Sequence, residues 1–326
     1  MSTDAPKTVL VTGAAGYVGG ALVRRLLADG ETRVIGVDAA EMAHGVDGVR
    51  EILDHPRLEF VRGDVRDTAA LLPLLRRADA VVHLAAIVGD PAGRRDPDLT
   101  RAVNVDASIA LADAAAENEV GHFIFVSTCS NYGVSDAGTL VGEDADLNPV
   151  SLYAETKVAV ERYLSGKPDF PYTVLRLATV YGVAPRMRFD LTVNQFTMEA
   201  FAERALSIYG EQFWRPYVHV EDVGRAIEMV LDTPRLAIGQ TFNVGDSDEN
   251  YTKGILYELL KQRLPDLEAE FVSVEEDPRS YKVSFRKVAD TLGFEVSRRV
   301  PDGVDEVLKL AELGAFSDFR DSRFRN

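Results

Sequence analysis

A short apolar strand followed by three spaced glycines is the feature that most constrains this chain. Residues 8–20 read TVLVTGAAGYVGG, an aliphatic run followed by a segment with helical apolar spacing. Such a run has the length of a buried parallel strand. Gly13 permits a tight turn, Gly16 lets backbone N–H groups approach a diphosphate, and Gly19 permits close packing of helix on strand. The spacing is GxxGxxG rather than GxGxxG, so its position between strand and helix carries the prediction of a dinucleotide site.

The next apolar run, residues 33–38, predicts a second strand that ends in Asp38. A carboxylate about twenty residues beyond the glycines accepts hydrogen bonds from the adenosine ribose of a dinucleotide. The same carboxylate would repel a 2′-phosphate, so the sequence favours NAD over NADP. The alternative is a solvated carboxylate at the end of a strand.

Apolar runs alternate with helical patterns through the first half of the chain. We predict helices at 68–77 and 98–119, and strands at 58–63, 80–85, 123–126 and 172–177. This alternation predicts an α/β fold of the Rossmann type, with a doubly wound parallel sheet.

In the second half of the chain the regular alternation of strand and helix patterns stops, and residues rich in Arg, Pro and aromatics follow. This change predicts a second lobe whose segments alternate with those of the first. We expect residues 1–180 to form the NAD-binding domain, with 217–245 returning to it, and 181–326 to form mainly a smaller C-terminal substrate-binding domain. Residues 182–220 are predicted to be irregular. The tail 320–326 alternates charges and is predicted to be a solvated end.

Charge and composition exclude several classes of partner. The 326 residues carry a formal net charge of −16, which would repel nucleic acid or an anionic membrane. An anionic ligand must therefore be held by local arginines and helix ends. The sequence contains no apolar signal segment or membrane-spanning run, and its single cysteine excludes an internal disulfide. The five histidines lack metal-ligand spacing, so we expect no metal, and we expect a cytoplasmic location.

Tyr153 and Lys157 lie four residues apart in a helix-compatible stretch, so their side chains share one face. A neighbouring ammonium favours the phenolate form of tyrosine, which suits a general base. A YxxxK pair is common by chance and is often a surface feature. Here it follows a strand that ends in Ser127-Thr128, at the sheet edge where such folds bind ligands.

These motifs occur in order with His83-Leu84-Ala85-Ala86, Asn104 and the stretch RPYVH at 215–219. Together they resemble an extended short-chain dehydrogenase/reductase, specifically the NAD-dependent nucleotide-sugar epimerase/dehydratase group, over nearly the whole chain. The resemblance implies a Rossmann domain that carries NAD and a smaller domain that binds a nucleoside diphosphate sugar. It also implies a homodimer formed through helices near 99–118 and 151–165, although these Ala-rich helices would equally pack within one chain.

The resemblance also implies a role for individual residues. Tyr153 resembles the catalytic base, Lys157 the residue that binds the nicotinamide ribose, and Thr128 the residue that hydrogen-bonds the reacting hydroxyl. The expected cofactor-binding residues are Gly13, Gly16, Tyr17, Val18, Gly19, Asp38, Asp64, Val65, Leu84, Ala85, Ala86, Asn104, Ser127, Tyr153 and Lys157. The expected substrate-binding residues are Thr128, Ser130, Thr179, Arg188, Asn194, Arg215 and Arg279.

Arginine suits diphosphate binding because its planar fork contacts two phosphate oxygens. Arg215 and Arg279 resemble the family positions that grip the nucleotide diphosphate. Arg186 is a further candidate, with a plain surface charge as the alternative.

Three departures from the family pattern bear on the reaction. The 4,6-dehydratases of the group carry Asp-Glu directly after the threonine, whereas this chain carries Cys129-Ser130, so water elimination lacks its acid and base. Cys129 is either one acid/base partner in an epimerisation or a small side chain that fills space. Thr179, where relatives often have Asn, and Val88, where some 4-epimerases have Lys, leave the substrate open.

The reaction predicted on these grounds is epimerisation of a nucleotide sugar by NAD, at C4, through a transient keto-sugar. A 4-ketoreductase with exchangeable NAD(P)H would use the same residues and is the alternative. A non-catalytic NAD-binding protein is a third possibility, against which the intact Thr128, Tyr153 and Lys157 argue.

Overall fold

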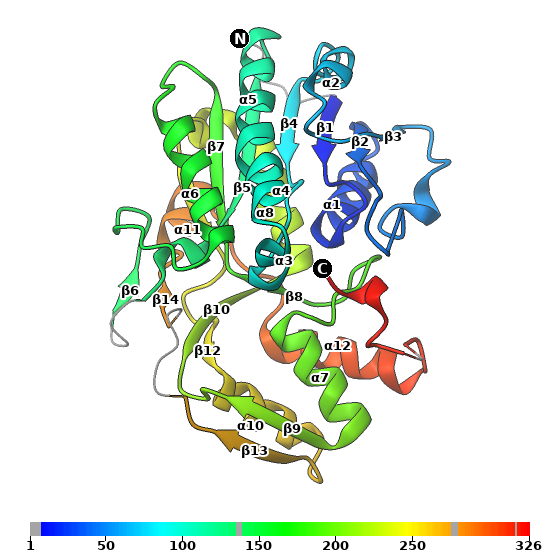
Figure 1. Ribbon diagram of the computed structural model, residues 1–326, viewed down its shortest axis with the longest axis vertical. Helices are drawn as coiled ribbons and strands as arrows, with labels where there is room; N and C mark the ends of the chain where they lie inside the picture. The colour runs from blue at the N-terminus through cyan, green and yellow to red at the C-terminus, as the bar shows by residue number, and fades with distance from the viewer. Residues whose placement is uncertain (1–7, 135–138, 275–279, 317) are drawn as a thin grey trace.

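A seven-stranded parallel sheet forms the larger lobe of the computed structural model, which describes residues 8–134, 139–274, 280–316 and 318–326 (Figure 1). The sheet order is β11-β7-β5-β4-β1-β2-β3. The order reverses between β1 and β4, and ligands of such sheets bind outside the carboxyl ends of the strands at this point. In chain order the strands are β1 (Thr8–Thr12), β2 (Arg33–Asp38), β3 (Leu58–Arg62), β4 (Ala80–His83), β5 (His122–Thr128), β7 (Tyr172–Leu177) and β11 (Thr241–Val244).

Apolar side chains fill both faces of this sheet, as is typical of parallel strands. Val9 and Val11 face a core shared with α1 and α8, whereas Leu10 faces a core shared with α2, α5 and α6. The doubly wound α/β fold predicted from the sequence is therefore confirmed. The helices of this lobe are α1 (Tyr17–Ala28), α2 (Thr68–Leu75), α3 (Asp90–Arg95), α4 (Pro97–Arg101), α5 (Ala107–Glu117), α6 (Leu152–Ser165), α8 (Val220–Asp232), α9 (Pro234–Ala237) and α11 (Arg286–Leu292).

Residues 98–119 do not form one uninterrupted α-helix. A π-helical turn, Ala102–Asp106, separates α4 from α5. Asn104 is buried within this turn and hydrogen-bonds the backbone of Ile87, so the local widening places a polar side chain against the loop after β4. Isolated π turns are frequent near functional sites.

The prediction that residues 182–220 are irregular is wrong. This stretch contains α7, β9 and β10 of a second lobe, which lies below the sheet in Figure 1. Val193, Phe196 and Ala200 have helical spacing and pack into that lobe's core, a signal obscured by the surrounding arginines. The lobe is built from β8 (Thr179–Tyr181), α7 (Thr192–Glu203), β9 (Ala205–Tyr209), β10 (Trp214–His219), β12 (Asn250–Thr252), α10 (Lys253–Arg263), β13 (Glu268–Val272) and α12 (Val300–Glu312).

Short elements complete the described chain. The two-residue strands β6 (Leu140–Val141) and β14 (Lys282–Val283) pair in parallel. Single 3₁₀ turns occur at Arg50–Ile52, Cys129–Tyr132 and Ser322–Phe324. Within the described ranges, the helices are too short or too polar to cross a lipid bilayer.

The C-terminal tail is folded against the protein, so the prediction of a solvated end is also wrong. The Phe324 ring lies 5.3 Å from the ring of Phe189, and the Phe189 N–H donates to the Phe324 carbonyl at 2.9 Å. The alternating charges of residues 320–326 predicted exposure to solvent, but Phe324, the aromatic residue among them, anchors the segment. Asn326 borders the central cavity of the molecule.

Candidate active site

The glycine turn brings backbone N–H groups to the carboxyl end of β1. Gly13 has φ +72°, and a Cβ there would lie 2.9 Å from the Ala85 nitrogen. A Cβ on Gly19 would lie only 2.0 Å from the Gly13 carbonyl oxygen, so α1 packs closer to β1 than a side chain would permit. Gly16 caps α1, and among the described residues no side chain caps this helix end. The first turn of α1 therefore presents its N–H groups to an anion.

Asp38 ends β2 on the same side of the sheet. Its two carboxylate oxygens accept hydrogen bonds from the Ala15 and Ala40 N–H groups, at 3.0 and 2.9 Å. These bonds fix the carboxylate beside the glycine turn. The arrangement fits a dinucleotide with a free 2′-hydroxyl, because a phosphate at that position would face a fixed negative charge.

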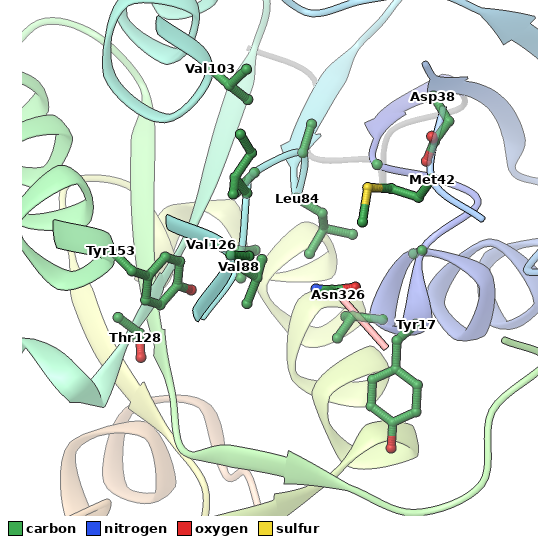
Figure 2. Close-up of a pocket in the computed structure, with 18 of the residues that line it drawn as sticks. Tyr17, Asp38, Met42, Leu84, Val88, Val103, Val126, Thr128, Tyr153 and Asn326 are labelled. Atoms are coloured by element: carbon green, nitrogen blue, oxygen red, sulfur yellow. The ribbon is translucent and has the colours of Figure 1, made fainter. Parts of the chain in front are cut away.

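Thr128, Tyr153 and Lys157 meet at the carboxyl end of β5. Thr128 is the last residue of that strand, and α6 begins beyond Ser151, whose hydroxyl accepts from the Ala154 N–H at 3.3 Å. The ammonium of Lys157 lies 5.9 Å from the centre of the Tyr153 ring. Figure 2 shows Thr128 and Tyr153 next to each other at one end of the pocket, with Asp38 at the other end.

The Lys157 ammonium is enclosed by protein. Its side chain is 2 % exposed, and Nζ donates to the Val126 carbonyl at 2.9 Å. Burial lowers the pKa of Lys157 to about 8, against the opposing effect of Glu161. At neutral pH the group stays mostly cationic, so its charge favours an anionic oxygen nearby.

A buried ion pair supports α6 from the sheet side. Arg176 of β7 donates to Glu161 of α6 at 2.7 and 3.0 Å. Glu161 also accepts from the Asn131 amide at 2.7 Å and from the Ser127 hydroxyl. Several donors thus compensate the burial of this carboxylate. The sequence offered one signal for it, since Glu161 lies four residues after Lys157 on the same helix.

A cavity of about 460 Å³ connects the glycine turn with Tyr153, a volume typical of pockets that hold small molecules. Most residues predicted to bind cofactor or substrate border it. They are Gly13, Gly16, Tyr17, Val18, Gly19, Asp38, Asp64, Val65, Leu84, Ala85, Ala86, Ser127, Thr128, Ser130, Tyr153, Lys157, Thr179 and Arg188.

Two predicted residues lie behind the cavity wall. Asn104 holds the loop after β4 through both its amide atoms, at 2.8 and 3.0 Å from the Ile87 backbone. Cys129 is 1 % exposed, and its thiol donates to the Arg176 carbonyl at 3.2 Å. Burial raises the pKa of the Cys129 thiol well above its usual value. This placement favours the packing role of Cys129 over the acid/base role.

Two predicted substrate residues, Asn194 and Arg215, do not border the cavity. Asn194 is fully buried and braces a loop, accepting from the Gly182 N–H at 2.9 Å and donating to the Arg188 carbonyl at 3.0 Å. Arg215 stacks over the Tyr281 ring at 5.5 Å. Arg279 lies outside the described residues.

Known proteins of one family resemble this chain in sequence and in fold. Residues 9–245 match the sequence profile of the NAD dependent epimerase/dehydratase family. The chain belongs to this family. The uncharacterized UDP-glucose epimerase YtcB of Bacillus subtilis is 33 % identical over 249 residues, which cover 74 % of this chain and 77 % of the relative.

Solved structures of the family share the fold over almost the full length. The dTDP-glucose 4,6-dehydratase DesIV from Streptomyces venezuelae, with NAD and TYD bound, has a TM-score of 0.83 against this chain. The two are 27 % identical, and the match covers 95 % of this chain and 98 % of that one. The UDP-glucuronic acid 4-epimerase from Bacillus cereus, with UDP-glucuronic acid and NAD, has a TM-score of 0.82 at 26 % identity over 94 % and 99 %. This family member is therefore an NAD-dependent enzyme, and its glycine turn and Asp38 fit that cofactor.

Sequence reasoning missed several residues that border the cavity of this epimerase/dehydratase family enzyme. Tyr281 donates from its hydroxyl to Ser130 at 3.4 Å, beside Thr128. Asn326, at the end of the chain, also borders the cavity, next to Arg186, which the sequence had named as a diphosphate candidate and which is 3 % exposed. Neither Tyr281 nor Asn326 belongs to a motif, so no local signal in the sequence identifies them.

Proposed function

We propose that this enzyme is a nucleotide-sugar 4-epimerase. The observation that carries the proposal is the group formed by Thr128, Tyr153 and Lys157. This group lies at one end of a cavity whose other end is bordered by Asp38 and the glycine turn. The names of the Bacillus subtilis relative and the Bacillus cereus structure, both epimerases, support this assignment.

The residues of the chain supply the proton chemistry. Tyr153, as phenolate, accepts the proton of the sugar hydroxyl, and Lys157 stabilises its negative charge from within the protein. Thr128 orients the reacting hydroxyl by a hydrogen bond. NAD, when bound, accepts a hydride and returns it. Rotation of the keto-sugar between the two transfers would present its other face, so that return of the hydride inverts the carbon while Tyr153 gives the proton back to the carbonyl oxygen.

The two residues after Thr128 argue against water elimination. Cys129 and Ser130 provide no carboxylate, and the Cys129 thiol is buried with a raised pKa. Elimination of water from the sugar needs an acid and a base beside the reacting carbons. Ser130 and Tyr281 instead offer neutral hydroxyl groups, which suit hydrogen bonding to a sugar.

A nucleoside diphosphate sugar is the substrate class that we propose. Arg188 borders the cavity and forms a two-point ion pair with Asp190, at 3.0 and 2.6 Å. This ion pair fixes the guanidinium at the cavity, and the N–H groups that it leaves over can donate to a phosphate oxygen. The chain has a net charge of −16, so local cations must hold such an anion.

Incubation of the purified enzyme with UDP- and dTDP-hexoses tests the proposal. We expect a product of unchanged mass, inverted at C4 by NMR, without added cofactor. Stoichiometric consumption of NAD(P)H would instead assign a 4-ketoreductase, and a product lighter by one water would assign a dehydratase. Either result would refute epimerisation.

A further inference from the structure

The C-terminal segment 322–326 reaches the cofactor cavity with its last residue, Asn326. Phe324 anchors the segment on the second lobe, where its ring packs against Phe189 and Phe316. Two residues later, Asn326 borders the same cavity as the glycine turn and Asp38. Figure 2 shows Asn326 near Tyr17 and Leu84, in the middle of the pocket.

Contacts on both lobes hold Asn326 at this place. Arg186 of the second lobe donates to the Asn326 side-chain oxygen at 2.8 Å and to the Arg325 carbonyl at 3.0 Å. Arg95 of α3 in the sheet lobe donates to the Asn326 backbone oxygen at 3.2 Å. The segment therefore bridges the two lobes at the cavity, and Figure 1 places the C-terminal end between them.

Arg186 has donor capacity that the protein leaves unused. Its side chain is 3 % exposed, yet among the described residues no acceptor pairs with its Nε. A buried unpaired donor is costly, so native proteins rarely keep one without a partner. The Arg186 side chain also borders the dinucleotide cavity, so its guanidinium is a cation of fitting charge for a phosphate oxygen.

We propose that segment 322–326 and Arg186 form a strap that retains bound NAD, with Arg186 contacting its pyrophosphate. Asn326 is one of the residues that line the cavity between Asp38 and Tyr153, so the segment forms part of the wall of the cofactor site. The inference rests on the proposed epimerase function, because an enzyme that returns the hydride to the same sugar gains from a cofactor that does not exchange.

The test measures NAD release from purified holoenzyme after rapid dilution, read by the NAD that remains on the protein. A chain that ends at Asp321 is expected to release NAD about tenfold faster, as the loss of one or two hydrogen bonds from a partly buried site predicts. Arg323→Ala is the matched control, because Arg323 lies in the same segment, pairs with Asp321 and does not border the cavity. It should release NAD at the wild-type rate.

An unchanged or slower release from the shortened chain would overturn the proposal. Removal of Phe324 could also unfold the second lobe, so Asn326→Gly is measured in parallel, with about threefold faster release expected and an unchanged rate counting against the strap. NAD release is read without any sugar. A protein that fails to epimerise would therefore contradict the proposed function alone, and not the strap.

Discussion

Thr128 and Cys129 are neighbours in sequence with opposite environments. The threonine hydroxyl reaches the cavity, whereas the cysteine thiol points into the core toward the Arg176 carbonyl. Thr128→Ala should lower turnover roughly 10–100-fold, because it removes a hydrogen bond to the reacting group, and Thr128→Ser should restore most of it.

Cys129→Ala should leave turnover within about twofold while lowering stability by about 1 kcal/mol. Steady-state kinetics of the three variants decide between the two roles of Cys129; a collapse of turnover in Cys129→Ala would restore the acid/base role.

Lys157 links stability to pH. Its pKa is about 8 in the folded protein and about 10.5 when unfolded, so between these values the unfolded chain binds more protons. The free energy of unfolding should therefore rise with pH in this window, relative to Lys157→Met. Between pH 7.5 and 9.5 we expect a relative gain of about 1–2 kcal/mol, measured by denaturant unfolding of both apo proteins. A difference that does not change with pH would show that Lys157 keeps an ordinary pKa.

The site residues that were predicted correctly belong to motifs whose spacing is fixed by the local backbone conformation. Gly13 and Asp38 could be located because a turn and a strand end impose their spacing, and Tyr153 and Lys157 because one helical turn separates them. Cys129 could not be assigned, because its direction depends on how β5 ends. The role of Tyr281 depends on a contact between distant parts of the chain, since its hydroxyl donates to Ser130 only in the folded protein.

At the scale of elements, the contact between β1 and α1 is the most constrained. Gly19→Ala would place a Cβ 2.0 Å from the Gly13 oxygen, which forces the helix away from the strand. We expect a loss of stability of roughly 1–3 kcal/mol from this overpacking, together with weaker NAD binding. Gly142→Ala is the control, since a Cβ there meets nothing within 4 Å. Thermal unfolding and NAD titration measure both effects; equal values for the two variants would contradict this reading of the glycine turn.

Periodicity identified the sheet strands up to β7, but not β11, α8 or the elements of the second lobe. Strands β1, β4 and β5 are buried almost throughout, because helices cover both faces of the sheet there. The strands β8 and β12 have only three residues each, so no period could emerge from them. The π turn at Ala102–Asp106 was hidden because the surrounding apolar spacing continues through it.

At the scale of the whole molecule, the two lobes meet at the cavity. The number of chains that assemble depends on the outer faces of α5 and α6. Tyr163 of α6 donates to Asp113 of α5 at 2.6 Å, so these helices already pack within one chain. We propose that their outer faces also form the homodimer that the family resemblance implies. Light scattering at micromolar concentration should then give twice the mass of one chain, whereas a monomer would remove the proposal.

The second lobe and the tail show why the whole could not be read from its parts. The anchoring of Phe324 on Phe189 joins residues far apart in sequence, so neither residue alone predicts the contact. The same holds for Arg186, whose guanidinium donates to the side chain of Asn326, far along the chain. Contacts of this kind form only when both lobes are assembled.

The central claim is that the Tyr153 oxygen performs the proton transfer beside a bound NAD, and Tyr153→Phe tests it most directly. We expect turnover to fall by roughly 10²–10⁴-fold, since the variant keeps the ring and loses the base. The NAD content of the purified variant, measured in the same sample, should equal that of the wild type. A variant that retains NAD and also retains wild-type turnover would contradict the account.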